Sequence, residues 1–356
     1  MIKFVRKIQV AMNIGIVTTT IFYNLAFTEV AFSEYEFKEL QNSQVHAAKS
    51  CVSGPHYGTY LGYNPLSITF NPDICHTEYK YVYYKPCDSG PAPLYVFLTG
   101  TAGDWESQWI QKELLVVMAK KGFIAASVEY SFDIFFSCQN LKKKSSCLFE
   151  SKKPESFKSR IQKAEYNRLK ENSTVLHGHS QGSFIANLAG QEFKEIQGLL
   201  LTGTGVRFGA ALTTHPTLIT SYAFNLSSCL TYNSQQLSNK NILAITGIDD
   251  EFFYEKKVCD LGSGAIQTNL ETVTGRACAP GSYRCLDSEK SGWIIVGSDE
   301  VDEGIAHHRY FLQGVNKACP IVLKSPKESK PSETWFDNSN DWSRDNTLDW
   351  LSRKIE

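Results

Sequence analysis

Six short apolar runs alternate with stretches of helical character, and this alternation constrains the fold of the chain more than any other feature. The apolar runs, each about the length of one strand, are Leu94–Leu98, Phe123–Val128, Thr174–Leu176, Gly198–Leu201, Ile242–Ile245 and Trp293–Val296. Helices are expected between them at Glu106–Lys121, Glu155–Lys170 and Ser183–Lys194. Such alternation is typical of a mostly parallel sheet with helices on both faces. The sequence therefore predicts an α/β fold.

The segments outside this alternation are predicted from composition and short-range patterns. Residues 34–66 are polar and rich in Gly and Pro, so an irregular lead-in is expected there. Leu66–Phe70 and Tyr79–Tyr84 are sheet-like and predict an antiparallel hairpin at the edge of the sheet. Glu251–Lys290 is expected to be a long loop held by disulfides, and the tail to end in a short helix around Trp350.

The sharpest local signal is the pentapeptide Gly-x-Ser-x-Gly centred on Ser180. An apolar run precedes it and a predicted helix follows it, which is the context of a nucleophilic serine on a strand-to-helix turn. Such a turn needs strained backbone angles, and glycines at 178 and 182 remove side chains that would collide there. The alternative is a structural serine in a turn. We expect Ser180 to be a nucleophile.

An oxyanion hole needs two backbone N–H donors. One comes from the residue after the nucleophile, here Gln181, and the other from the loop after an earlier strand. The run that ends at Leu98 continues into a loop with glycines at 100 and 103, and Thr101 is the candidate for the second donor. The alternative for this loop is an ordinary strand-to-helix turn.

A serine nucleophile also needs a base, and the base needs a carboxylate that orients it. Two carboxylates, Asp249 and Asp250, follow the late apolar run Ile242–Ile245, although paired acids in a turn are usually solvated or cap a helix. Two histidines, His307 and His308, follow the last apolar run. His308 is favoured as the base because a basic residue and then an aromatic one follow it, and His307 stays open.

The order Ser180, Asp250, His308, with Gly-x-Ser-x-Gly on an elbow, resembles the α/β-hydrolase superfamily, in particular its esterases and lipases. The resemblance covers roughly residues 80–314. It implies an eight-stranded sheet, a cap after the sixth strand and an acyl-enzyme mechanism, and its Gly-x-x-Asp pattern favours Asp250 over Asp249. The chain departs from it at Leu98, where Thr-Gly follows instead of the His-Gly of many members, so the oxyanion donor is left open.

The N-terminus has the plan of an export signal. A basic start is followed by the apolar stretch Ile8–Phe27 and by a small-x-small site at Ala31–Ser33, so residues 1–33 are expected to be a signal peptide and 34–356 one domain. An uncleaved membrane anchor is the alternative. Gly203–Asn239 mixes apolar and turn residues and is expected to be the cap insertion of that domain.

Cysteine usage also favours an exported protein. The ten cysteines all follow the expected cleavage site, and an even number predicts up to five disulfides in an oxidising compartment, secreted or periplasmic. The alternative is that several are buried thiols. They are Cys51, Cys75, Cys87, Cys138, Cys147, Cys229, Cys259, Cys278, Cys285 and Cys319.

Charge and motifs restrict the partners. With 36 basic and 37 acidic residues the formal net charge is −1, which gives no reason to expect nucleic acid. No Cys-x-x-Cys or Cys/His pattern of a zinc site occurs, so no metal is expected. No cofactor is expected either, because the Ser-His-Asp mechanism needs none. The predicted function is a secreted serine hydrolase that cleaves small-molecule or lipid esters, without stable membrane insertion after signal cleavage. A serine peptidase, an acyltransferase and a non-catalytic binding protein of the same fold are the rivals; the oligomeric state stays open.

Overall fold

The computed structural model describes most of the chain after residue 50. The described residues are 51–65, 75–100, 105–131, 137–166, 168–215, 218–233, 238, 241–250, 253, 263–302, 304, 306, 308 and 333–355, with the backbone alone for 208–224, 263–265 and 333. The expected signal peptide, Thr101, His307, Cys259 and Cys319 lie outside them.

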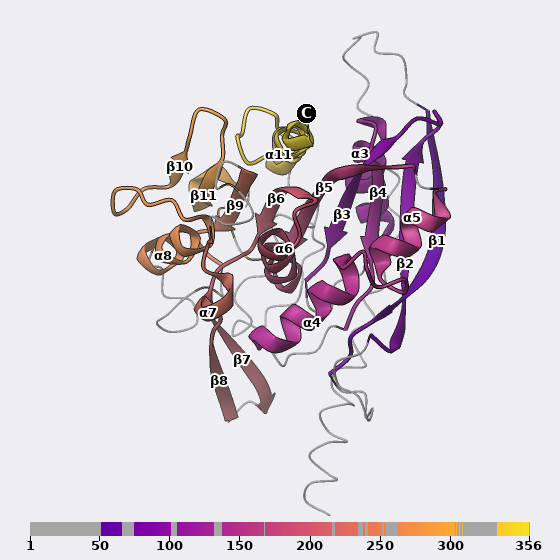
Figure 1. Ribbon diagram of the computed structural model, residues 1–356. Coiled ribbons are helices and arrows are strands. Elements are labelled where there is room, and N and C mark those ends of the chain that lie inside the picture. Colours follow the sequence, from indigo (N-terminus) through magenta and orange to yellow (C-terminus); the bar gives the residue numbers. More distant parts are fainter. Residues whose placement is uncertain are drawn as a thin grey trace, which may run out of the picture. The chain divides into compact units, whose positions relative to one another are not determined.

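Nine strands of the described residues form one mixed sheet in the order β1-β2-β4-β3-β5-β6-β9-β11-β10 (Figure 1). The strands are β1 (Val52–Gly62), β2 (Thr77–Pro86), β3 (Ala92–Leu98), β4 (Ile124–Val128), β5 (Leu169–His179), β6 (Ile196–Thr202), β9 (Ile242–Gly247), β10 (Arg284–Leu286) and β11 (Gly292–Val296). The six from β3 to β11 that carry the expected apolar runs are parallel to one another, and β1, β2 and β10 pair antiparallel at the two edges. The predicted α/β sheet is confirmed.

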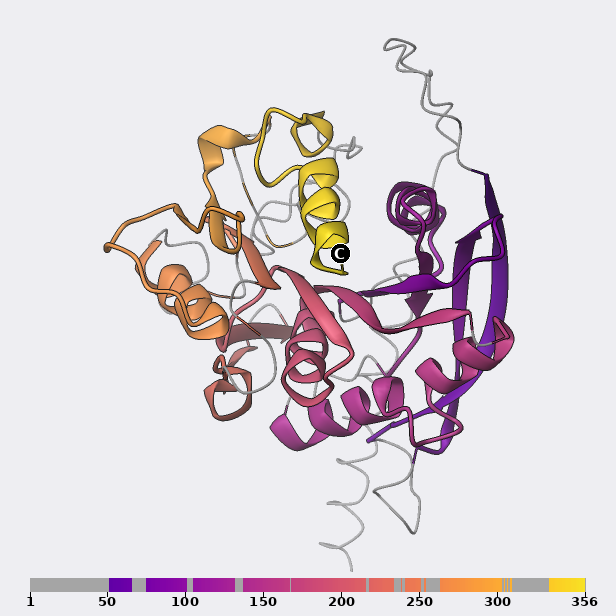
Figure 2. The same cartoon turned by 45° about the horizontal axis from the view of Figure 1, so that its top comes forward.

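Helices cover both faces of this sheet, α3 and α11 on one and α4, α6 and α8 on the other (Figure 2). The described helices are α2 (Gln108–Ile110), α3 (Val116–Lys120), α4 (Cys138–Phe149), α5 (Phe157–Ala164), α6 (Gln181–Glu192), α7 (Ser227–Leu230), α8 (Ser263–Thr274), α10 (Glu333–Phe336) and α11 (Arg344–Ser352), with a π-helical turn (Gln111–Leu115) between α2 and α3. Serines at 107, 137 and 156 cap α2, α4 and α5, since each side chain accepts a backbone N–H of the first turn.

Successive residues of one strand face the two helix layers alternately. On β3, Leu94, Val96 and Leu98 pack toward α4 and α6, whereas Tyr95 and Phe97 face the layer of α3 and α11.

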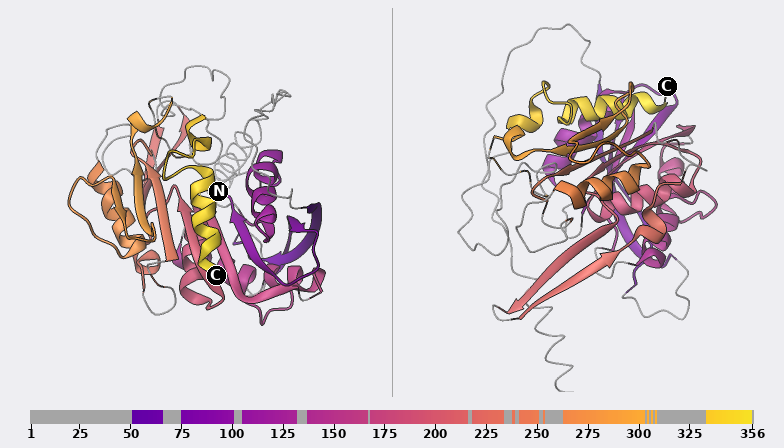
Figure 3. Two further views of the ribbon diagram at one scale, coloured as in Figure 1. Left: turned by 90° about the horizontal axis from the view of Figure 1, so that it is seen from above. Right: turned by 90° about the vertical axis from the view of Figure 1, so that its left-hand side faces the viewer.

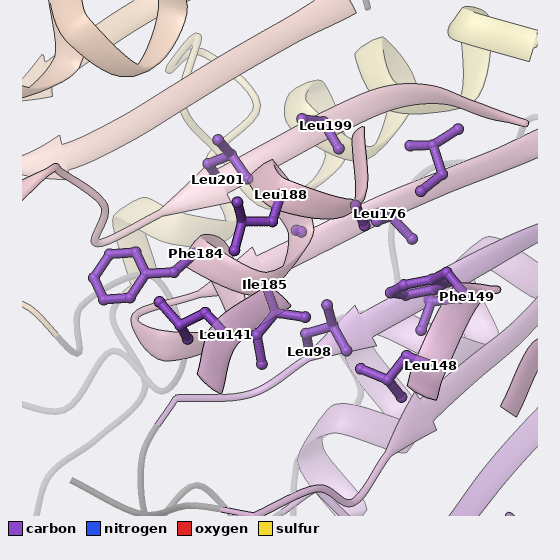
Figure 4. Packing of buried hydrophobic residues seen from close by; sticks show 14 of the residues in the cluster. Leu98, Leu141, Leu148, Phe149, Leu176, Phe184, Ile185, Leu188, Leu199 and Leu201 are labelled. Atoms are coloured by element: carbon purple, nitrogen blue, oxygen red, sulfur yellow. The ribbon is translucent and has the colours of Figure 1, made fainter. Parts of the chain in front are cut away.

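The helix α6 is buried on all sides: ten of its twelve residues are enclosed, as a helix in the centre of a large core requires. Figure 4 shows its Phe184, Ile185 and Leu188 packed among leucines of β3, β5, β6 and α4. This packing holds the residue at the start of α6 in a fixed position relative to the strands.

The N-terminal edge differs from expectation. Within residues 34–66, where an irregular lead-in was predicted, β1 pairs with β2 over nine registered positions, and the expected strand Leu66–Phe70 lies outside the described residues. The Gly and Pro content misled the prediction because Pro55 is tolerated at a sheet edge, and Gly58 sits opposite Tyr81, whose ring would be 2.3 Å from a Cβ there.

The segment Glu251–Lys290 is not the long loop that the sequence predicted. Its described part from Ser263 onward forms the helix α8, which packs against β9 and β11, and the short strand β10. The buried Ile266, Leu270 and Val273 of α8 recur at helical spacing, a signal that the cysteines around them obscured. The helix α4 was not predicted at all, whereas the expected C-terminal helix is α11.

The chain divides into two compact units, Lys49–Ala210 with Ser221–Glu356 and Met1–Ala48 with Ala211–Thr220. The described part of the second unit is the tip of a two-stranded hairpin, β7 (Arg207–His215) and β8 (Leu218–Asn225), which Figure 3 shows. This hairpin and α7 fall within Gly203–Asn239, the segment expected to be the cap. The sheet and all the candidate site residues belong to the first unit.

Among the described residues of the first unit, four disulfides join cysteines: Cys51–Cys87, Cys75–Cys147, Cys138–Cys229 and Cys278–Cys285.

Candidate active site

Ser180 lies on a sharp turn between β5, which ends at His179, and α6, which begins at Gln181. Its backbone has φ 52° and ψ −122°, a region that residues with a side chain rarely adopt. The turn is held by hydrogen bonds from Ser180 N to Thr202 O at 3.0 Å and from Ser183 N to Ser180 O at 2.9 Å. This is the strained strand-to-helix elbow that the motif predicts.

The two glycines of the motif are required by close backbone contacts. A Cβ at Gly178 would lie 2.4 Å from the carbonyl oxygen of Gly182, and a Cβ at Gly182 would lie 2.1 Å from that of Leu98. Real Cβ atoms do not approach backbone so closely, so any side chain here would push α6 away from the strand ends. The glycines therefore let the elbow rest directly on β3.

The hydroxyl of Ser180 is not used to cap α6, and the side chain is partly exposed. Gly100, two residues after β3, lies against it, because a Cβ at Gly100 would be 2.9 Å from Ser180 Cβ and 3.4 Å from Ser180 Oγ. Gln181 opens α6 and places its N–H at the positive end of that helix. Thr101, the other expected oxyanion donor, lies outside the described residues.

Asp250 and His308 are joined by a hydrogen bond between Oδ2 and Nδ1 at 2.8 Å. They are 58 positions apart in the chain, and both are buried. A carboxylate on Nδ1 orients an imidazole and leaves its Nε2 for a second partner. Of the residues that sequence analysis left as alternatives, Asp249 is hydrogen-bonded elsewhere, and His307 lies outside the described residues.

The ring of His308 lies next to the elbow. Its centroid is 4.9 Å from that of His179, the residue before Ser180, and the Nδ1 of His179 is 3.1 Å from the hydroxyl of Thr202. Gly203 follows β6 with φ 53°, and a Cβ there would be 2.8 Å from His308 Cε1. The structure thus brings His308, Asp250 and the elbow together.

Two further rings near the site, those of His179 and Phe253, were not expected from the sequence. The ring of Phe253 is 5.7 Å from that of His308 and 6.4 Å from that of Phe184 on α6. The contact of His179 with His308 could have been suspected from its place inside the Gly-x-Ser-x-Gly motif. Phe253 gave no such signal, since its neighbours in the sequence carry no recognisable periodicity.

Asp249 is hydrogen-bonded to two residues that precede His308 in the chain, Ser298 and Ala306. Its Oδ2 accepts the backbone N–H of Ala306 at 2.8 Å and the hydroxyl of Ser298 at 2.7 Å. Consecutive carboxylates therefore contact different groups, Asp250 an imidazole and Asp249 a backbone amide.

A further histidine of β5, His177, is enclosed between Tyr95 and Phe97, and its Nδ1 is 3.0 Å from the hydroxyl of Tyr95. Burial lowers the pKa of His177 to about 3, so its ring is neutral near pH 7. The ring is 3% exposed, which separates it from solvent and from any substrate.

Metal-binding and membrane-spanning features are absent from the described part of the chain. No group of three His, Cys, Asp or Glu there could hold a metal ion. No helix in the same part is both long and apolar enough to cross a membrane.

The fold is that of the α/β hydrolases. Its marks are the strand order of the sheet, the elbow after β5, and the order Ser180, Asp250, His308 along the chain. Eight strands form the sheet that the resemblance implied, and β10 adds a ninth at its edge.

Comparison with solved structures finds esterases among the similar chains. A bacterial heroin esterase is 11% identical, with 86% of this chain and 85% of the other covered and a TM-score of 0.47. Thermogutta terrifontis esterase 2, phosphonylated by cyclosarin, is 14% identical, with 72% and 85% covered and a TM-score of 0.40. A Pyrobaculum calidifontis esterase is 12% identical, with 56% and 68% covered and a TM-score of 0.38. No family model matches the chain, and neither does any curated protein.

Proposed function

We propose that this protein is a serine hydrolase that cleaves carboxylic esters, with Ser180 as nucleophile, His308 as general base and Asp250 as the residue that orients His308. The observation that carries the proposal is the buried 2.8 Å hydrogen bond between Asp250 and His308, whose ring lies beside the strained elbow of Ser180. A structural serine in a turn would not need this backbone conformation or a buried carboxylate–imidazole pair next to it.

In the proposed reaction His308 removes the hydroxyl proton of Ser180 as the serine oxygen attacks the ester carbonyl. The N–H of Gln181, with Thr101 as the proposed second donor, stabilises the negative charge on the carbonyl oxygen. The C–O bond then breaks, and the leaving alcohol takes the proton from His308. Water attacks the acyl-enzyme by the same route, releases the acid and restores Ser180.

We further propose that the chain is exported after removal of residues 1–33 and that Gly203–Asn239 is a cap. Four disulfides support an oxidising compartment, because such bridges are rare in reducing cytosol. The substrate proposed is a small-molecule or lipid ester, with neither nucleic acid nor a cofactor as partner.

The test is labelling with a fluorophosphonate probe followed by peptide mapping, together with hydrolysis of p-nitrophenyl esters from acetate to dodecanoate. We expect stoichiometric labelling at Ser180. Ser180→Ala should lose labelling and lower kcat/KM by roughly 10⁴- to 10⁶-fold, because the nucleophile and its base act as a unit.

Ser183→Ala is the matched control, since this serine lies one turn into α6 and its hydroxyl bonds to Ser180 O at 2.6 Å without belonging to the proposed triad. It should keep labelling at Ser180. Full ester hydrolysis by Ser180→Ala would refute the proposal. Activity on peptides or acyl transfer to an alcohol in place of ester hydrolysis would favour the rival enzymes, and folded protein without labelling would favour a binding protein.

A further inference from the structure

We infer that Asp249 is a positioning residue, which clamps the segment that carries His308 onto the end of β9. The inference rests on the proposed function for its effect on activity. It assigns to the second carboxylate of the pair a task separate from that of Asp250.

The clamp has three hydrogen bonds. Asp249 Oδ2 accepts from Ala306 N at 2.8 Å and from Ser298 Oγ at 2.7 Å, and Asp249 N donates to Ala306 O at 3.1 Å. Asp249 therefore binds both backbone groups of Ala306, one with its side chain and one with its own main chain. A residue held at both its N–H and its C=O cannot rotate about the strand end without breaking one of these bonds.

Ala306 packs tightly against the backbone at the end of β9. Ala306 is fully buried, and a Cβ at Gly247, the last residue of β9, would lie 1.8 Å from Ala306 O. Only a glycine allows this approach, so the segment rests on bare backbone. Ser298, from the turn after β11, donates its hydroxyl to the same oxygen of Asp249.

The register of the contacts links the clamp to the proposed base. Asp249 binds Ala306 and Asp250 binds His308, so two consecutive residues of one chain segment bind two positions of the other that are two apart. A shift of Ala306 would move His308 relative to Asp250 and to the elbow. Misplacement of a catalytic group by about 1 Å can cost about 10²-fold in rate.

The bonding also predicts which substitution is tolerated. Both side-chain bonds use one oxygen of Asp249 as acceptor, and an asparagine offers a carbonyl oxygen of the same reach. Asp250 differs, because its charge stabilises the imidazolium that forms during the reaction. Replacing aspartate by asparagine should therefore leave kcat unchanged at position 249 and lower it at position 250.

The experiment compares Asp249→Ala, Asp249→Asn, Ser298→Ala and Asp250→Asn in the full-length protein. Hydrolysis of p-nitrophenyl butyrate gives kcat and KM, and hydrogen exchange followed by mass spectrometry gives the protection of the peptide that contains Ala306. Asp249→Ala should lower kcat about 10- to 100-fold with KM unchanged and should speed exchange at Ala306. Asp249→Asn should have the wild-type kcat and the wild-type exchange rate at Ala306. Asp250→Asn should lose about 10⁴-fold in kcat with exchange at Ala306 unchanged.

Ser298→Ala keeps the inference testable if Asp249→Ala does not fold, since it removes one of the two side-chain bonds and should give a smaller loss of the same kind. Wild-type kcat and wild-type exchange in Asp249→Ala would overturn the clamp, as would an Asp249→Asn variant that is impaired as much as Asp249→Ala. Failure of the proposed function shows separately, as wild-type protein without Ser180 labelling or ester hydrolysis. The exchange measurement then still decides whether Asp249 holds Ala306.

Discussion

At the scale of single residues, the burial of His177 makes the stability of the fold depend on pH. Its pKa is about 3 in the folded protein because burial disfavours the charged ring, and it has its ordinary value of 6.5 when exposed. Between these values the unfolded chain binds a proton that the folded chain does not. Stability contributed by the neutral ring is therefore present above pH 6.5 and is lost as the pH falls toward 3, by up to about 1.4 kcal/mol per pH unit.

We predict that His177→Asn makes the free energy of unfolding less dependent on pH. Urea denaturation at several values between pH 7 and pH 4.5 should show the wild type losing stability more steeply than the variant, by about 1 kcal/mol per unit in the lower half of the range. The test compares the slopes of unfolding free energy against pH, and not the free energies themselves, because the substitution also changes stability at every pH. Parallel curves for the two proteins would mean that His177 has the same pKa in the folded and unfolded states, which would contradict the prediction.

The same scale shows what sequence alone could and could not assign. Ser180 is found by its motif because the strained turn dictates glycines at fixed positions. Asp249 and Asp250 could not be separated by residue type or position, since adjacent residues of a turn point in directions that only the backbone decides. In the structure Asp250 N bonds to Gly247 O, and its side chain faces His308.

At the scale of elements, the parallel strands and α6 were predictable because a strand covered on both faces must be apolar along its length. Edge strands obey weaker constraints. β1 carries Gly and Pro because it has a partner on one side only, and β10 is three residues long. α4 was not predicted because its many polar residues and lysines make the apolar pattern of the buried Leu141, Leu148 and Phe149 weak in the sequence.

The contact of α6 with the strand ends gives a prediction with an internal control. Gly182→Ala places a Cβ 2.1 Å from Leu98 O, a backbone atom, whereas Gly190→Ala, on the same helix, meets the flexible end of Leu199 at 2.8 Å. We expect Gly182→Ala to cost about 1–3 kcal/mol of unfolding free energy, as overpacking does, and to lower ester hydrolysis. Gly190→Ala should be close to neutral, since the gain in helix propensity offsets the shift of Leu199.

Denaturant unfolding and kcat/KM of the two variants check this prediction. Equal stability losses would show that the fit of α6 against β3 does not depend on the backbone contact at Gly182. An active, stable Gly182→Ala would mean that the second glycine of the motif is not required by its approach to Leu98 O.

At the scale of the whole molecule, disulfides tie together elements that are distant in sequence. Cys138–Cys229 joins the start of α4 to α7 across 91 positions, and Cys75–Cys147 joins the segment before β2 to the end of α4 across 72. Cys278–Cys285, in contrast, closes 7 positions between α8 and β10. The long bridges restrict the unfolded chain much more than the short one does.

This difference predicts unequal losses when bridges are removed in pairs. In the chain-entropy account, Cys138→Ala with Cys229→Ala should lower the free energy of unfolding by about 4–5 kcal/mol, and Cys278→Ala with Cys285→Ala by about 2 kcal/mol. Urea denaturation under non-reducing conditions measures both, and thiol counting on unfolded protein verifies that the remaining bridges are intact. An equal or larger loss from the short bridge would indicate that native-state contacts, not the restriction of the unfolded chain, determine what these disulfides contribute.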